Sequence, residues 1–121
     1  MKSTEYWLVH EHTQFELLLR ECKAAASISD WPALEHSFSR LVEALRFHIA
    51  QEEEILFPAY DAKCEPSHMS TRELYNEHSV IVDGFRILHK IILTRSPQAS
   101  YDCIASIEKL LIDHNQKEES A

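Results

Sequence analysis

The residues with the greatest capacity for chemistry are histidines and glutamates that occur twice in the same order. In each half of the chain, 36 positions separate a lone His, preceded by Glu, from the His of an H-x-x-x-E-E run. The matched segments are Glu11-His12 with Glu77-His78, and His48…Glu52-Glu53 with His114…Glu118-Glu119. Imidazoles and carboxylates without thiolates are typical ligands of divalent transition metals. The duplicated pattern therefore predicts a metal site built from two related halves.

Spacing within each run indicates how the ligands share the metals. Residues four apart, such as His48 and Glu52, lie on one face of a helix about one turn apart. The His can then bind one metal while the Glu reaches sideways to a second. The predicted site holds two metals, each with two imidazoles, bridged by two carboxylates and about 3.5–4 Å apart. The six predicted ligands are His12, His48, Glu52, His78, His114 and Glu118.

Apolar residues recur at helical spacing in four segments, which predicts an all-α, up-down-up-down antiparallel four-helix bundle. One Gly and four Pro leave little turn material for a many-stranded β fold. The first helix is expected from about Thr4 to Ala26 and the second from a cap at Asp30 to near Pro58, with Ile55 on its inner face. Further caps are expected at Ser70, with Glu73 and a Met69–Leu74 staple, and at Ser96 before Pro97.

The predicted bundle brings the six residues to one end. The lone histidines lie early in the first and third helices, and the H-x-x-x-E-E runs lie late in the second and fourth. Neighbouring helices run antiparallel, so these positions are level. Any one of these residues is more often an ordinary core histidine or surface pair, but six together favour metal, because burying carboxylates without cations costs several kcal/mol, as an order of magnitude.

Other histidines and glutamates have weaker predictions. The glutamates beside the ligands are expected to point outward, support the helix or hydrogen-bond to the ligands; these are Glu11, Glu53, Glu54, Glu77 and Glu119. The remaining histidines are expected at the surface; these are His10, His36, His68 and His89. The expected inner wall consists of Phe15, Leu45, Ile81 and Leu111, with Leu8, Ile55 and Leu74 as an outer lid. Such a pocket suits a small apolar gas.

Composition restricts the class of protein. A chain of 121 residues fits one domain spanning 1–121, and a net charge of −8 disfavours nucleic acid and anionic membrane as partners. No signal peptide or bilayer-spanning stretch is evident. The three scattered cysteines, Cys22, Cys64 and Cys103, indicate reduced thiols of a cytoplasmic protein, with Cys22 in the core. No particular oligomeric state is indicated.

The chain resembles the hemerythrin-like, HHE cation-binding family. The resemblance rests on Glu11-His12, on the run from His48 to Pro58 with its H-x-x-x-E-E-x-x-L-F-P pattern, on Glu77-His78, and on His114 to Glu119. It implies a four-helix bundle with a non-haem di-iron centre. Carried over, His12 and His48 would bind one iron, and His78 and His114 the other. Glu52 and Glu118 would bridge them; Mn or Zn are alternative metals.

Departures from the family pattern favour one subtype. Oxygen-carrying hemerythrins have a second His one turn from the third-helix His, where this chain has Leu74 and Val82, and a bridging Asp five residues after the last His, where Glu118 follows at four. The ligand set is more similar to the repair-of-iron-centres type. It also resembles the iron- and oxygen-sensing hemerythrin domain of an F-box ubiquitin ligase subunit, which has a Glu where this chain has Ile49. By the repeat, Ala121 corresponds to Ile55, so either the last helix is truncated at Ala121 or its final turn, which holds Glu118, is short and frayed.

Three functions follow as hypotheses. The leading one is a di-iron protein that binds or senses O2 or NO, or handles iron under oxidative or nitrosative stress. The second is a small di-iron enzyme, an oxidase, peroxidase or NO-handling activity, although no acid, base or substrate group beyond the ligands is evident. The third is a structural bundle with a degenerate metal site.

Overall fold

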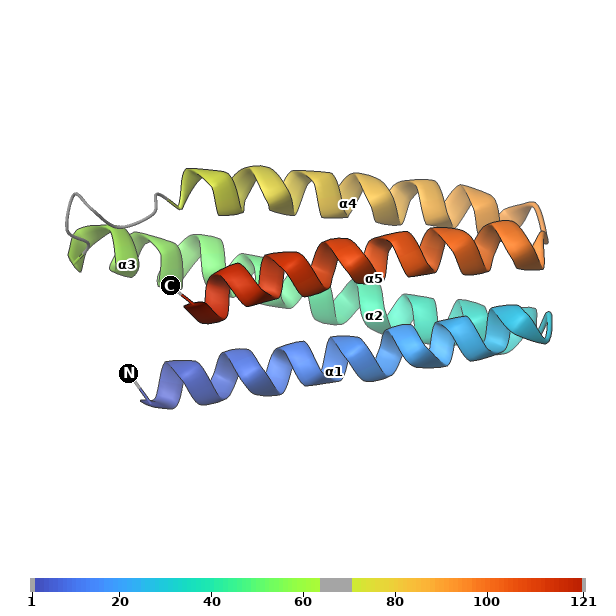
Figure 1. Cartoon of the computed structure of the whole chain (residues 1–121), viewed down its shortest axis with the longest axis horizontal. Coiled ribbons are helices and arrows are strands. Elements are labelled where there is room, and N and C mark those ends of the chain that lie inside the picture. The colour runs from blue at the N-terminus through green and yellow to red at the C-terminus, as the bar shows by residue number, and fades with distance from the viewer. Residues whose placement is uncertain (1, 64–70, 121) are drawn as a thin grey trace.

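The protein is an all-α four-helix bundle. The computed structural model describes residues 2–63 and 71–120. Four long rods run antiparallel to their neighbours in the order of the chain (Figure 1), which confirms the predicted architecture. The rods are α1 (Lys2–Ser27), then α2 (Trp31–Gln51) continued by a π-helical turn η1 (Glu52–Leu56) and α3 (Phe57–Lys63), then α4 (Arg72–Leu93) and α5 (Pro97–Ser120).

The two short connections lie at one end of the bundle. Ser29 and Arg95 adopt positive φ values of 57° and 58° just after α1 and α4, the left-handed conformation that reverses a chain after a helix. Asp30 accepts a hydrogen bond from the Ala33 N–H at 3.2 Å, and Ser96 Oγ accepts one from the Ala99 N–H at 3.3 Å. Both predicted caps are therefore confirmed, and they start α2 and α5.

The third predicted cap falls on residues outside the described range. Ser70 and Met69 belong to residues 64–70, so the capping box and staple predicted for them lie outside the described residues. Thr71 precedes α4 and donates its hydroxyl to Asp61 Oδ2 at 2.7 Å. This bond ties the start of α4 to α3 near the same end of the bundle as the predicted ligands.

The second rod differs from the prediction. The sequence placed its end near Pro58, whereas the helix continues to Lys63 through the π-helical turn η1. The Phe57 N–H bonds to the Glu52 carbonyl, five residues back, and a new α-helical segment then begins at Phe57. Pro58 consequently lies in the first turn of α3, where a missing N–H is tolerated. π-helical turns of this kind occur frequently at functional sites.

The π turn also changes which residues face inward. Ile55, expected on the inner face and in the lid, is 56% exposed, whereas Phe57 is only 5% exposed. A wider turn accommodates an extra residue, so the spacing expected for an α-helix fails after Glu52. The prediction for Ile55 was wrong for this reason, and Phe57 takes the inward position.

The hydrophobic core fills the bundle from the connections toward the histidines. The expected wall residues Phe15, Leu45, Ile81 and Leu111 are all buried, and so is Cys22. Gly84 lies on α4, where an added Cβ would come within 3.3 Å of Ile107 Cγ1 on α5, so its lack of a side chain permits a close helix approach. None of the described helices is long and apolar enough to cross a membrane.

Candidate metal centre

The structure brings the six predicted ligand residues together at one end of the bundle. All six side chains are buried, the imidazoles at 2–3% and the carboxylates of Glu52 and Glu118 at 1% and 7% residue exposure. α1 begins and α5 ends at this same end of the molecule, beside α3 (Figure 1). In the last described turns of α5, Glu118 is buried inside the bundle.

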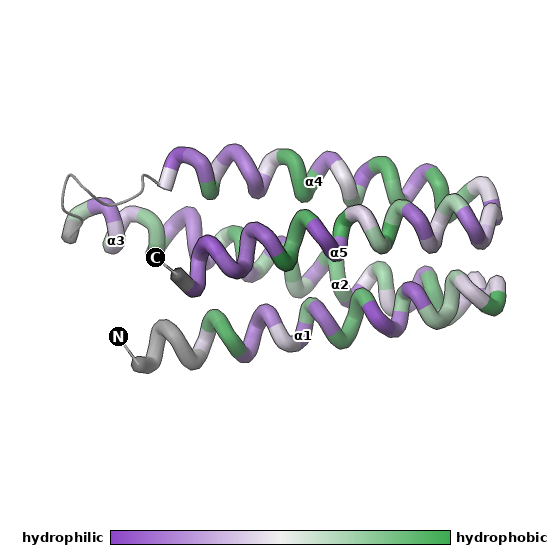
Figure 2. The backbone as a smooth tube through the Cα atoms, viewed as in Figure 1, coloured by the Kyte–Doolittle hydropathy of each residue, from purple (hydrophilic) through white to green (hydrophobic). Residues whose placement is uncertain are grey.

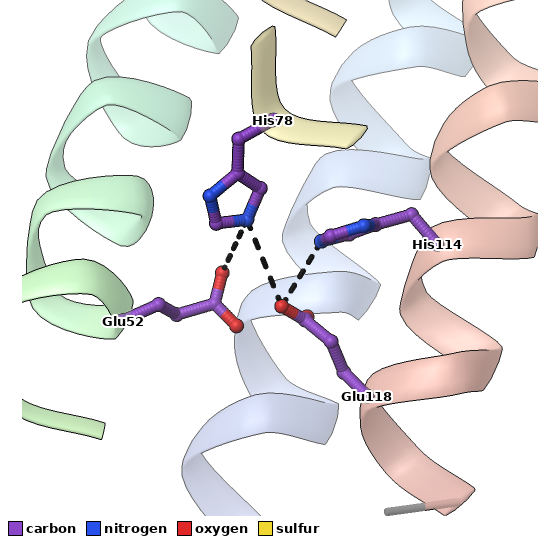
Figure 3. A group of neighbouring side chains, drawn as sticks. All are labelled: Glu52, His78, His114 and Glu118. Atoms are coloured by element: carbon purple, nitrogen blue, oxygen red, sulfur yellow. Dashed lines mark hydrogen bonds and ion pairs between the residues drawn. The ribbon is translucent and has the colours of Figure 1, made fainter. Parts of the chain in front are cut away.

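Two inner carboxylates link the imidazoles. Glu52 Oε1 lies 2.9 Å from Nε2 of His48 and 3.1 Å from Nε2 of His78. Glu52 therefore contacts a His of its own rod and a His of the other half of the chain. In Figure 3, dashed lines join His78 to the carboxylates of both Glu52 and Glu118, and join His114 to Glu118.

Glu118 makes the equivalent contacts with the remaining pair. Its Oε1 lies 3.0 Å from His12 Nε2, and its Oε2 lies 3.0 Å from His114 Nε2. The same carboxylate comes within 3.8 Å of His48 Nε2 and His78 Nε2. Glu118 is thus near all four imidazoles, the position that a bridging ligand occupies.

A second set of carboxylates contacts the outer nitrogens of the rings. Nδ1 of His78 lies 2.8 Å from Glu53, Nδ1 of His114 lies 2.8 Å from Glu77, and Nδ1 of His12 lies 3.2 Å from Glu119. Glu11 is 3.8 Å from Nδ1 of His48, beyond hydrogen-bond distance. Four of the five glutamates that the sequence left without a definite role thus lie beside the ligand imidazoles, and the fifth, Glu54, is exposed.

The contacts in the two halves of the chain are related by the internal repeat. An offset of 66 residues carries His12 onto His78, His48 onto His114, and Glu52 onto Glu118. The same offset carries the Glu53–His78 contact onto the Glu119–His12 contact, and the Glu11–His48 pair onto the Glu77–His114 pair. In every case the outer carboxylate lies beside a His of another helix. The repeated E-H and E-E dipeptides thus encode contacts between helices, which no single-helix pattern reveals.

The outer contacts determine which ring nitrogen carries the proton. A carboxylate has no proton to donate, so Nδ1–H of His12, His78 and His114 donates to it. Each Nε2 then turns a lone pair toward carboxylate oxygens that are also acceptors. Every inner nitrogen must therefore carry a proton or bind a metal ion, and carboxylate–imidazole–metal chains are the usual arrangement around bound metals.

Unpartnered buried atoms agree with a cation-binding role. Both ring nitrogens of His48, Nε2 of His78 and Oε1 of Glu52 are buried without a hydrogen-bond partner among the described residues. Unpaired buried polar atoms cost about 1–3 kcal/mol each. Lone pairs that converge on a common point, rather than on one another's hydrogens, fit a bound cation.

The protonation preferences reflect the same crowding of carboxylates. Burial lowers the pKa of His48, but Glu118 and Glu52 outweigh it and raise the pKa to about 9. Burial likewise opposes the effect of Glu118, Glu52 and Glu53 on His78, whose pKa rises to about 10. Burial raises the pKa of Glu118, but the four imidazoles hold it well below its ordinary value. The buried carboxylates thus favour a positive charge on the imidazoles of His48 and His78.

Two overlapping groups of atoms have the spacing of a metal site. Ligand atoms of Glu52, His78, His114 and Glu118 lie within 4.8 Å of one another, and so do those of His12, His48 and Glu118. Both groups are buried, and Glu118 belongs to both. The arrangement can hold two neighbouring cations with a shared carboxylate.

Aromatic side chains that sequence reasoning did not assign to the site cover two of the imidazoles. Trp7 stacks on His48 with ring centroids 4.9 Å apart and planes 11° apart. Phe57 stacks on His78 at 5.4 Å and 20°, and Tyr75 contacts Phe57 edge-on. Trp7 precedes Glu11 by one helical turn, a signal that could have placed it beside His48. Phe57 could not have been placed, because its orientation depends on the π turn.

Comparison with known protein families agrees with this geometry. The model of the hemerythrin HHE cation binding domain matches residues 4–121. The chain belongs to the hemerythrin HHE cation-binding family. Searches of curated proteins and of solved structures found no match to it.

Membership of the hemerythrin family connects the buried cluster with cation binding. The match covers both halves of the repeat, including the two E-H dipeptides and the two H-x-x-x-E-E runs. The family description names cation binding, and the buried His and Glu groups are where this hemerythrin domain could hold a metal ion. The remaining described histidines, His10, His36 and His89, are exposed and stand apart from the cluster.

Proposed function

We propose that this hemerythrin-family protein binds two iron ions and uses them to bind or sense a small gaseous ligand, O2 or NO, under oxidative or nitrosative stress. His12 and His48 would hold one iron, and His78 and His114 the other. Glu52 and Glu118 would be shared between them. The irons, when bound, supply reversible redox change and open coordination positions.

One observation carries the proposal. Inner nitrogens of four buried imidazoles converge on two buried carboxylates, while outer carboxylates hold three of the outer N–H groups. This arrangement directs lone pairs, not hydrogens, into a closed space. Cations resolve that repulsion, and two of them match the two groups of ligand atoms.

The donor set favours iron. Imidazole with carboxylate and no thiolate suits iron, manganese or zinc, and carboxylate bridging between paired metals favours the first two. Iron also has the redox chemistry that O2 and NO require. Two imidazoles and shared carboxylates leave each metal with fewer protein ligands than six, so a small molecule has room to bind.

The chain's own residues select the size and polarity of that ligand. Phe15 and Leu45 form apolar wall beside His12 and His48, and Phe15 meets the His48 ring edge-on at 5.0 Å. Ile81 and Leu111 are buried in the equivalent places of the other half. An apolar surrounding excludes water and offers no hydrogen-bonding anchor for a large polar substrate, which favours a diatomic gas.

Elemental analysis and optical spectra test the proposal. Protein purified from iron-replete cells should contain about two irons per chain, the number of ligand groups found. Its ligand-to-metal absorption bands should change reversibly when O2 or NO is added to the reduced protein. His78→Ala should lose mainly one iron. Protein that contains no iron and has the same stability with and without a chelator would contradict the proposal.

The same preparation distinguishes the enzymatic alternative. Catalytic turnover of peroxide or NO that His48→Ala abolishes without unfolding would assign an enzyme rather than a sensor. Reversible binding without turnover supports the proposal as stated.

A further inference from the structure

The two halves of the metal centre differ around one pair of equivalent histidines. His114 has its Nδ1 2.8 Å from Glu77, whereas His48, its equivalent by the repeat, has Glu11 3.8 Å away and no hydrogen bond from Nδ1 to any described residue. Since both halves share the same ligand types, the difference must come from residues around Glu77 and Glu11.

Lys117 accounts for the closer contact at His114. Its ammonium donates to Oε2 of Glu77 and, at 3.0 Å, to Oε1 of Glu73. Glu77 is thereby gripped on one oxygen while its other oxygen faces His114 Nδ1. Glu77 is therefore held in place between the Lys117 ammonium and the His114 ring.

In the first half, the residues at the equivalent positions cannot form this ion-pair network with Glu11. The offset of 66 residues places Gln51 at the position of Lys117 and Trp7 at that of Glu73. Both members of the ion-pair network are thus replaced, and Trp7 instead stacks on the His48 ring. Stacking limits the ring's tilt but supplies no acceptor for Nδ1–H, so the tautomer of His48 is less firmly determined.

The ligand groups differ in the same direction. Four residues meet around His78 and His114, with Glu52 and Glu118 both within reach, whereas three meet around His12 and His48. A metal whose ligand atoms already lie close together, and whose imidazole has a fixed tautomer, should dissociate more slowly, because groups that hydrogen-bond to the ligands commonly change metal affinity by roughly 10–100-fold.

We propose that Lys117 is a positioning residue that makes the two metal positions unequal. By holding Glu77 on His114, it makes the position of His78 and His114 the retained one. The position of His12 and His48 is then the one from which metal exchanges. This inference rests on the proposed two-metal function and names which metal is mobile.

Iron release into a chelator tests the inference. Full-length ferrous protein, loaded with two irons, is mixed without oxygen with an excess of a strong coloured chelator. The natural protein should release one iron quickly and the other slowly. Lys117→Gln, which places the residue of the other half at this position, should accelerate the slow phase by roughly 10–100-fold. Lys117→Arg keeps the charge and should retain the slow phase.

Two matched variants assign the phases. Gln51→Lys makes the reverse change at the equivalent position and should leave the slow phase unchanged. His12→Ala, which keeps the position of His78 and His114, should release its remaining iron at the slow rate. If Gln51→Lys and Lys117→Gln changed the rate of the slow phase equally, the rate would depend on the overall charge near the site. That result would overturn the role of Lys117.

A spectroscopic measurement separates positioning from loss of stability. In zinc-loaded protein, nuclear magnetic resonance should detect Nδ1–H of His114 exchanging slowly with water. Lys117→Gln should speed this exchange at least about tenfold, by the same range of outer-ligand effects. Nδ1–H of His78, which pairs with Glu53, is the internal control and should stay unchanged.

The outcomes distinguish this inference from the function on which it rests. Two irons released at one rate, or a slow phase unaffected by Lys117→Gln, would overturn the role of Lys117 and leave a two-iron protein. A chain that binds no iron would overturn the proposed function itself, and this inference with it.

Discussion

The two ends of the bundle are stabilised in opposite ways. At the end with the short connections, the rods meet through aliphatic side chains, and Leu19, Leu34, Leu88 and Ile104 are fully buried. At the other end the buried layer consists of imidazoles and carboxylates. Figure 2 shows the change along α5, whose C-terminal part is largely hydrophilic.

The two ends therefore have different roles: one stabilises the fold, and the other holds the candidate metal site. Aliphatic packing at the first end stabilises the bundle without any ligand, and Arg95 adds an ion pair with Glu35 and a contact over the Trp31 ring. The charged layer at the second end lacks that independent stability, because its atoms repel one another unless protons or metals lie between them. We therefore expect changes at the two ends to affect different measurements.

The largest expected effect is on metal binding, from Glu52→Gln. Removing this charge takes away one of two inner carboxylates, and metal content should fall from about two irons per chain to one or fewer, as expected when a bridging ligand is lost. Elemental analysis measures the content. Glu54→Gln, two residues away and exposed, is the control and should bind as the natural protein does. Full iron content in Glu52→Gln would contradict the bridging role.

Leu88→Ala should act on the opposite end. This fully buried leucine leaves a cavity when shortened, which should reduce the free energy of unfolding by about 2–5 kcal/mol. Denaturant unfolding measures the loss, and iron content should stay unchanged. Leu93→Ala, at a position that is 60% exposed, should cost under about 0.5 kcal/mol. Loss of iron from folded Leu88→Ala would show that the two ends are not separable.

The pH dependence of stability should come from the end of the bundle that holds the histidines. In metal-free protein the pKa values of His48 and His78 are raised to about 9 and 10, above the ordinary 6.5. A raised pKa stabilises the folded state fully below the unfolded pKa, and this stabilisation is lost as pH rises through the folded pKa. Metal-free protein should therefore lose stability between about pH 7 and pH 10.

Denaturant unfolding at several pH values checks this expectation. Leu88→Ala should show the same slope with pH as the natural protein, because no histidine changes. Metal-loaded protein should not show this loss of stability. Metal ions take the place of the protons on the imidazoles, and protons compete less with the metal as pH rises. Constant or rising stability of metal-free protein over this range would show that the imidazoles are not protonated beside the carboxylates.

The smallest expected effect is optical. The chain has two tryptophans, Trp7 stacked on His48 and Trp31 near the connections at the other end. Iron loading should quench the fluorescence of Trp7 far more than that of Trp31. Trp7→Leu should remove most of the change, and Trp31→Leu should preserve it. Loss of stacking in Trp7→Leu should cost about 0.5–1.5 kcal/mol of stability, beyond the buried area.

Much of the fold and of the candidate site could be predicted from local patterns. Apolar residues at helical spacing indicated four amphipathic helices, and Asp30 and Ser96 indicated where two of them begin. The antiparallel arrangement of the helices alone predicted that His12 lies level with His48, and His78 level with His114. These features depend on spacing within one helix and on chain direction, and both are written directly in the order of residues.

Other features depend on contacts between helices. The outer carboxylates supply an example: Glu53 belongs beside His78 and Glu77 beside His114, although each follows or precedes a different His in the chain. A dipeptide indicates that two residues are neighbours in sequence, but not which helix each side chain faces. The π turn is a second example, since it reversed the exposure of Ile55 and Phe57 without any change in residue type.

The order of residues by itself determined the helix class, the family and the six ligand candidates, because two short runs of metal-binding residue types recur at one spacing on the apolar faces of the helices. Tertiary structure alone decided that Lys117 grips Glu77, whereas Gln51 takes the equivalent place in the other half, and that Trp7 covers His48. Those distinctions arise where side chains from separate helices meet. Their distances depend on how the helices pack, which spacing along the chain does not specify.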